Sequence, residues 1–96
     1  MNKTEYLLTV LAEECVETAQ RATKAIRFKL DEIQEGQHLN NAQRLVYEFN
    51  DIVAVMEELK EHGLIGQLYD REMIEEKKTK MKKYFAYSES LGTLHQ

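Results

Sequence analysis

The sequence contains no proline and only four glycines among its 96 residues. Proline and glycine are the residues least compatible with the interior of a helix, so their scarcity favours long helices over a fold rich in turns. The abundant Glu, Lys, Leu, Ala, Gln and Met are good helix formers. We therefore expect an all-α fold.

Cysteine is nearly absent as well. The single residue, Cys15, has no partner for an intramolecular disulfide, so a reducing cytoplasm is the expected location. No apolar run approaches the ~18 residues of a membrane span, and the N-terminus lacks the apolar core of a signal peptide. We expect no membrane partner.

A surplus of basic charge is missing too. Net charge is −4 with a pI near 5.4, which counts against a nucleic-acid partner. At 96 residues the chain has room for one domain with a thin core. We expect one domain over residues 1–87 and a polar, frayed C-terminal tail over 88–96, with self-association to complete the core.

Three helices are predicted from the spacing of apolar residues. Asn2 and Glu5 form a capping-box pattern at the start of the first helix, which we expect to reach about Glu35. That is long for a globular helix and suggests a kink or a partner contact. Its expected core stripe follows three-to-four spacing: Leu8, Leu11, Cys15, Ala19, Ala22, Ile26 and Ile33.

The second helix should begin after Asn40, which forms a capping box with Gln43, and end at His62-Gly63. Its apolar residues cover about half of a helical wheel, wider than one neighbour requires. Asp70 is the expected N-cap of a third helix with a narrower apolar face. Together these features predict three main helices with a core completed by self-association.

Four carboxylates are unusually placed on these wheels. Glu14 and Glu17 lie three residues apart on the flank of the first stripe, with Glu13 nearly opposite the stripe. Glu48 falls inside the apolar arc of the second helix and Asp51 at its edge. A carboxylate in such a place needs a proton, a protein cation or a metal ion to offset its burial.

Simpler interpretations stay open at this point. Glu14 and Glu17 are compatible with an ordinary solvated flank. Glu48 could pair with Lys77 in a structural salt bridge, and Lys77 could instead extend its ammonium to water while its stem packs. Cys15 on the core stripe is expected to act as a small apolar packing residue.

Carboxylate oxygens without histidine or cysteine ligands select Mg²⁺, Mn²⁺ or Ca²⁺. Mg²⁺ held by carboxylates and water is the usual partner of a polyphosphate substrate. The residues alone therefore predict metal-dependent phosphate chemistry.

The two acidic motifs, Glu13-Glu14-Cys15-Val16-Glu17 and Glu48-Phe49-Asn50-Asp51, resemble the paired E-E-x-x-E and E-x-x-D motifs of the MazG-like, all-α nucleoside triphosphate pyrophosphohydrolases. That superfamily includes dimeric dUTPases, dCTP pyrophosphatases and phosphoribosyl-ATP pyrophosphohydrolases. The resemblance covers about residues 5 to 62, and the gap between the motifs is longer here than is typical.

The resemblance implies Mg²⁺-dependent hydrolysis of a nucleoside triphosphate between its α and β phosphates, with Mn²⁺ as a substitute. It also implies a homodimer or homotetramer, with a four-helix-bundle-type core completed by oligomerisation. It assigns the metal to Glu14, Glu17, Glu48 and Asp51. Glu13, Glu48 and Lys77 are its catalytic candidates. The phosphate-binding candidates are Lys77, Lys80, Lys83 and Arg21.

The alternative function is a non-catalytic helical interaction or nucleotide-binding protein. A nucleic-acid patch over Lys77 to Lys83 is a weaker idea, because Glu75 and Glu76 directly precede these lysines and the chain is acidic overall.

Overall fold

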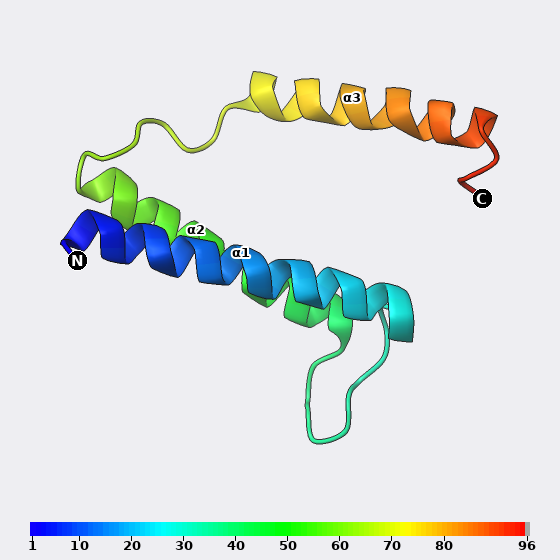
Figure 1. The fold of residues 1–96 in the computed structure, drawn as a ribbon, viewed down its shortest axis with the longest axis horizontal. Helices are drawn as coiled ribbons and strands as arrows, with labels where there is room; N and C mark the ends of the chain where they lie inside the picture. The colour runs from blue at the N-terminus through cyan, green and yellow to red at the C-terminus, as the bar shows by residue number, and fades with distance from the viewer. Residues whose placement is uncertain (96) are drawn as a thin grey trace.

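A computed structural model describes residues 1–95 of the chain (Figure 1). These residues form three helices: α1 (Lys3–Phe28), α2 (Asn41–Glu61) and α3 (Arg71–Ser90). Helices α1 and α2 pack side by side and antiparallel, joined by the loop over residues 29–40, and α3 stands apart from them. The all-α prediction with three helices is confirmed.

Helix α1 begins as its sequence predicts. The Asn2 side chain accepts a hydrogen bond from the Glu5 N–H at 2.8 Å, and the Glu5 side chain accepts one from the Asn2 N–H at 3.4 Å. The predicted end at Glu35 is wrong, because the helix stops at Phe28 and the next residue, Lys29, has φ of 78°. The exposed apolar residues Leu30 and Ile33 continued the helical spacing past the real end.

The loop after α1 is fastened to the start of α2. Asn41 is 1% exposed, and its side-chain amide donates to the Lys29 carbonyl at 2.8 Å and to the Glu32 carboxylate at 3.1 Å. The backbone N–H of Ala42 donates to the Leu30 carbonyl at 2.9 Å. These bonds pull the chain back toward α2 and account for the early end of α1.

Both ends of α2 match their predictions. Asn40 and Gln43 form a reciprocal capping box, and Gly63 adopts φ of 69° after the last turn. The N–H of Gly63 donates to the Lys60 carbonyl and that of Leu64 to the Leu59 carbonyl. These two bonds are those of a Schellman cap, which favours glycine at the left-handed position.

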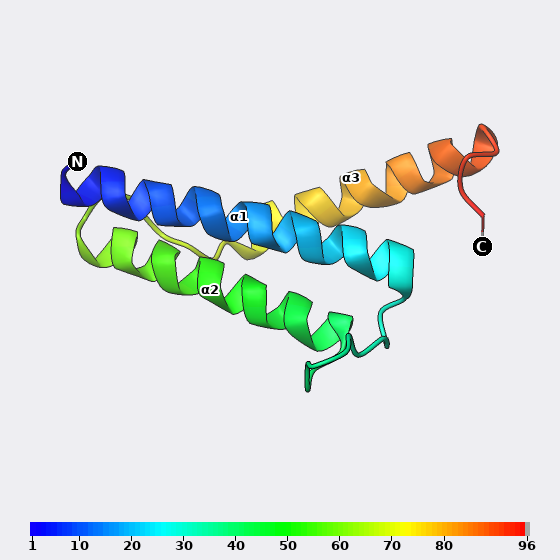
Figure 2. The same ribbon diagram turned by 60° about the horizontal axis from the view of Figure 1, so that its bottom comes forward.

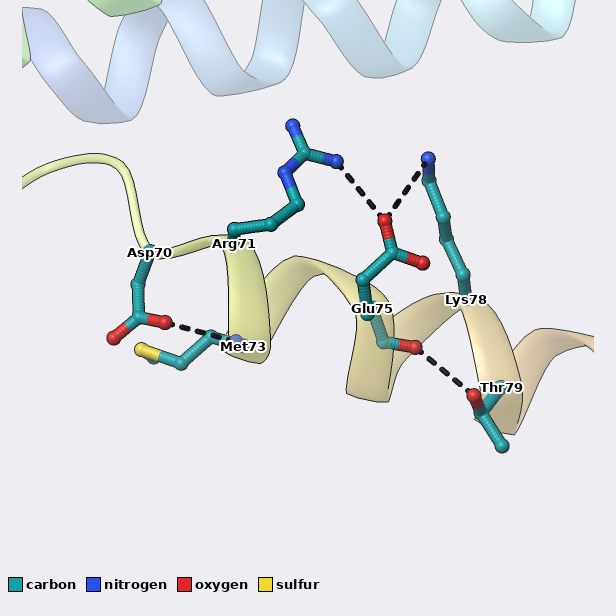
Figure 3. Close-up of polar contacts among 6 residues, drawn as sticks. All are labelled: Asp70, Arg71, Met73, Glu75, Lys78 and Thr79. Atoms are coloured by element: carbon teal, nitrogen blue, oxygen red, sulfur yellow. Dashed lines mark hydrogen bonds and ion pairs between the residues drawn. The ribbon is translucent and has the colours of Figure 1, made fainter.

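Helix α3 starts at the predicted cap, where the Asp70 carboxylate accepts from the Met73 N–H at 3.1 Å (Figure 3). Glu75 then pairs with Arg71 at 3.0 Å and with Lys78 at 3.8 Å, and its carbonyl accepts from the Thr79 hydroxyl. The helix continues to Ser90, so the first residues of the expected frayed tail over 88–96 are helical.

The core lies at one end of the α1–α2 pair. Leu7, Val55 and Leu59 are buried there, and four partly buried apolar residues pack against them: Val10, Leu11, Met56 and Ile65. The predicted core stripe of α1 is therefore displaced by about one residue. Cys15 is exposed, so its predicted packing role is wrong within this chain, and Leu8 and Ile26 are exposed as well.

The molecule is extended. Its radius of gyration is 16.8 Å, whereas a compact domain of this length would have about 12.5 Å. Figure 2 shows the cause, because α3 continues away from the α1–α2 pair and not across it. Among residues 1–95, no helix has the combined length and apolarity that crossing a membrane requires.

Candidate functional site

Heptad spacing places the candidate site in the seam between α1 and α2. Leu7, Glu14 and Arg21 follow one another at seven-residue intervals on α1, and each is buried or half-buried. Because seven residues make nearly two helical turns, they share one face. On α2 the same spacing joins Asn41, Glu48 and Val55.

Because α1 and α2 pack antiparallel, the polarity of the residues in the seam changes along its length. Its apolar end holds Leu7 and Val55, and its far end holds Arg21 bonded to Asn41 at 3.5 Å. Glu14 and Glu48 occupy the corresponding middle positions of the two heptads. The acidic centre of the seam is therefore flanked by an apolar cluster on one side and a buried cation on the other.

Glu14, Glu17 and Glu48 form a compact carboxylate group, which we call the acidic trio. Each offers one oxygen, and these oxygens all lie within 4.8 Å of one another. Glu14 and Glu48 are half-buried and Glu17 is exposed. Two helices thus bring three of the four predicted metal ligands into reach of a single ion.

Asp51, the fourth predicted ligand, lies outside the trio but acts on it. It is half-buried one helical turn beyond Glu48, and its charge raises the pKa of both Glu14 and Glu48. It also lines an open hollow with Gln43, Val46, Tyr47 and Asn50.

The electrostatics of the trio are unfavourable to its ionised form. Burial raises the pKa of Glu14 above its ordinary value of 4.5, and the charges of Glu17, Asp51 and Glu48 raise it further. The pKa of Glu48 is raised by burial and by Glu17, whereas Arg21 opposes that shift. Desolvation and like-charge repulsion both favour a bound proton or cation.

Two oxygens of this site are shielded and lack hydrogen-bond partners. They are Oε2 of Glu14 and Oε2 of Glu48, and the Nε of Arg21 shares this condition. Such groups normally find a partner when they are shielded from water, because an unmet hydrogen bond destabilises the fold. The carboxylate oxygens are thus available to a ligand that enters the seam.

Arg21 is the one predicted phosphate-binding residue that lies beside the acidic trio. It is 7% exposed, and its guanidinium donates to the Asn41 side chain. Arg21 lies in the seam, at the heptad position after Glu14. Asn41 was not singled out from the sequence, although an asparagine directly after the Asn40 cap was a visible signal.

The lysine candidates are not brought to the trio. Lys77, Lys80 and Lys83 are exposed on α3, which makes no contact with α1 or α2 among residues 1–95. The alternative pairing of Glu48 with Lys77 is therefore not formed within this part of the chain. Glu13 is exposed and lies outside the trio.

Comparison of the chain with models of protein families, with curated proteins and with solved structures finds no match.

Proposed function

We propose that the protein is a Mg²⁺-dependent pyrophosphohydrolase that cleaves a nucleoside triphosphate, or a related nucleotide, to the monophosphate and pyrophosphate. The observation that carries the proposal is the acidic trio, whose three carboxylates lie within 4.8 Å of one another across two helices. Its members occupy the motif positions that resemble the MazG-like enzymes. Four nearby acids fit this activity better than a structural role, because their repulsion weakens the fold.

The donor set suits a hard divalent cation. It consists of carboxylate oxygens from Glu14, Glu17 and Glu48, with Asp51 one turn away, and two of these oxygens are shielded from water without a partner. Mg²⁺ prefers oxygen ligands, and Mn²⁺ accepts the same set. When bound, the metal supplies Lewis acidity to a phosphoryl group and lowers the pKa of a bound water.

The chain's own residues would orient the substrate. Arg21, fixed by Asn41, supplies a buried positive charge at one end of the acidic centre. The hollow beside Asp51 exposes the Tyr47 ring, on which a nucleobase could stack, and the Asn50 amide, which could donate to it. The role of Glu13 toward the attacking water rests on the resemblance alone, because its side chain is exposed outside the trio.

The proposed assembly is a homodimer or homotetramer with a four-helix core. Two observations support it. Among residues 1–95, three apolar side chains are buried. Helices α1 and α2 also keep large apolar residues exposed, among them Leu8, Val16, Val46 and Phe49. Such faces are typical of surfaces that another subunit covers.

Glu48→Gln tests the activity, because it removes the charge of the most central carboxylate at nearly constant volume. We expect purified protein with Mg²⁺ to release pyrophosphate from at least one of a panel of canonical and modified nucleoside triphosphates. The variant should lose at least 100-fold in turnover, about the scale of a lost catalytic group.

Glu57→Gln is the matched control, since Glu57 is an exposed residue of the same helix. It should retain wild-type turnover. A Glu48→Gln variant that keeps full activity would show that the trio is not the catalytic site.

A second candidate function is nucleotide binding without cleavage. The observation that favours it is the separation of Lys77, Lys80 and Lys83 from the acidic trio, which leaves Arg21 as the one predicted phosphate ligand in the seam. Thermal stabilisation by Mg²⁺ and a triphosphate, with no pyrophosphate released from any substrate in the panel, would distinguish this function.

A further inference from the structure

Helix α3 has no helix packed against it among residues 1–95. Within residues 1–95, its 20 residues make no contact with α1 or α2, and none of its side chains is buried. A single helix of this length is only marginally stable in water, because helices in proteins owe most of their stability to packing of an apolar face. A packing surface beyond those of α1 and α2 of the same chain is therefore needed to stabilise α3.

The surface of α3 is suited to packing. Met73, Met81 and Tyr84 lie on one face at helical spacing, with Phe85 beside them, and they are 67%, 59%, 60% and 45% exposed. Met81 and Phe85 also line an open apolar hollow with Lys78 and Lys82. We call Met73, Met81, Tyr84 and Phe85 the α3 face.

Four charged groups near the start of α3, those of Asp70, Arg71, Glu75 and Lys78, interact within the helix and its cap. Glu75 is satisfied by Arg71 and Lys78 from the same helix, and Asp70 caps the first turn (Figure 3). These contacts stabilise α3 locally and leave the α3 face uncovered.

The net charges of the three helices indicate which helix α3 would contact. Helix α3 carries six basic and four acidic residues, a net charge of +2. Helix α2 carries five acidic and two basic residues, a net charge of −3, whereas α1 carries four of each. Lys77, at the centre of the α3 face, would need an acidic neighbour once covered. Helix α2 is therefore the complementary partner.

Helix α2 also offers an apolar hollow. It is lined by Phe49, Ile52, Val53 and Met56, together with Leu68 and Tyr69 from the connection to α3. Leu68 and Tyr69 of the connection line one side of this hollow, and the connection then leads into α3, which stands apart from α2 of the same chain (Figure 1). A helix from another molecule would not be constrained in this way.

We propose that α3 of one chain docks on α2 of a second copy, with the α3 face against the Phe49–Met56 hollow and the two chains exchanging α3 reciprocally. Such an exchange is self-complementary and closes as a two-fold dimer. The proposal specifies the contact for the self-association proposed above and is independent of the proposed hydrolysis.

The area available is adequate for a stable dimer. We take each of the four α3-face side chains to lose roughly 100 Å² of accessible surface on docking. One α3 and the surface of α2 that receives it then bury about 800 Å² together. The two exchanged α3 helices of a dimer would bury about 1,600 Å², which is the size of a standard stable interface.

Met81→Asp tests the contact, because it places a charge in the middle of the α3 face. We expect the wild-type chain to have a mass in solution of at least twice the 11.3 kDa of one chain. The variant should raise the dissociation constant by about 100-fold, the loss typical of a central apolar contact. Light scattering after size exclusion, over a concentration series, measures both.

Thr79→Asp is the matched control, since it introduces the same charge on the opposite side of α3 and should leave the mass unchanged. Far-UV circular dichroism at high concentration checks that both variants remain helical. A wild-type chain that is monomeric at every concentration overturns self-association altogether. An oligomer that Met81→Asp leaves intact overturns the role of α3 alone. Pyrophosphate release is not a readout in either case, so the hydrolase proposal is judged separately.

Discussion

Glu14 and Glu48 are held in the seam at an electrostatic cost. For both carboxyls, burial and neighbouring acids raise the pKa above 4.5 in the folded chain. Between pH 4.5 and the folded pKa, the native state binds more protons than the unfolded state. The free energy of unfolding contributed by these groups is therefore greatest below pH 4.5 and falls as pH rises through the folded pKa.

We accordingly predict that metal-free protein loses less stability between pH 5 and pH 8 when both residues are replaced, in Glu14→Gln/Glu48→Gln. Urea unfolding in the presence of a chelator measures the difference, with Glu57→Gln as the control for a single exposed charge. Added Mg²⁺ should stabilise wild type at pH 8 and not the double variant. Parallel pH curves for the wild type and the double variant would contradict the prediction.

The position of Glu48 was predictable from sequence because its neighbours Ile52 and Val55 define an apolar arc that encloses it. Glu14 was harder, since α1 has two partly apolar faces and the spacing does not say which one α2 covers. In the structure, α2 covers the face of α1 that carries Leu7 and Arg21, and Cys15 is exposed. A heptad shared between two helices, visible only when both are aligned, was the missing signal.

At the scale of the elements, the hinge after α1 stores backbone strain. Lys29 has φ of 78° and ψ of 156°, a region that glycine enters readily and other residues do not. We predict that Lys29→Gly stabilises the fold by about 1 kcal/mol. Lys29→Ala is the control, because it removes the side chain and keeps the strain. Chemical denaturation of the three proteins gives the comparison, and equal effects of Gly and Ala would show that the strain is not the cause.

Caps were the most predictable parts of the elements. Asn2, Asn40 and Asp70 each cap the helix assigned to them, because capping depends on residues within one turn. The end of α1 was missed because it depends on Asn41, which lies 12 residues after Lys29. The Asn41 side chain donates to both the Lys29 carbonyl and the Glu32 carboxylate. A local pattern contains no information about such a bond.

At the scale of the whole molecule, the extended shape is itself measurable. A monomeric form, obtained with Met81→Asp at low concentration, should have a radius of gyration near the 16.8 Å of this structure. A chain in which α3 folded back on its own hairpin would approach the ~12.5 Å of a compact domain. Small-angle X-ray scattering separates the two values. The lower one would mean that α3 covers α2 of its own chain.

Sequence indicated that one chain makes too small a core, but not which surfaces remain open. The separation of α3 explains why Lys77 does not meet Glu48 in one chain, although both sit on apolar faces. A helical wheel gives the face of its own helix on which Lys77 or Glu48 lies. The distance between the two residues in space depends on the connection over residues 62–70, and helical periodicity does not predict the path of a connection.

The antiparallel hairpin also has a kinetic consequence. The seam starts beside the loop, where Arg21 bonds to Asn41, 20 residues further along the chain, and its later pairs can close in order toward Leu7 and Val55. Each step then adds little loop-closure entropy, and small helical chains fold in microseconds to milliseconds. The acidic trio, built on α1 and α2 alone, would therefore assemble in the first folding phase of each chain. Any association through α3 would follow as a slower, concentration-dependent phase.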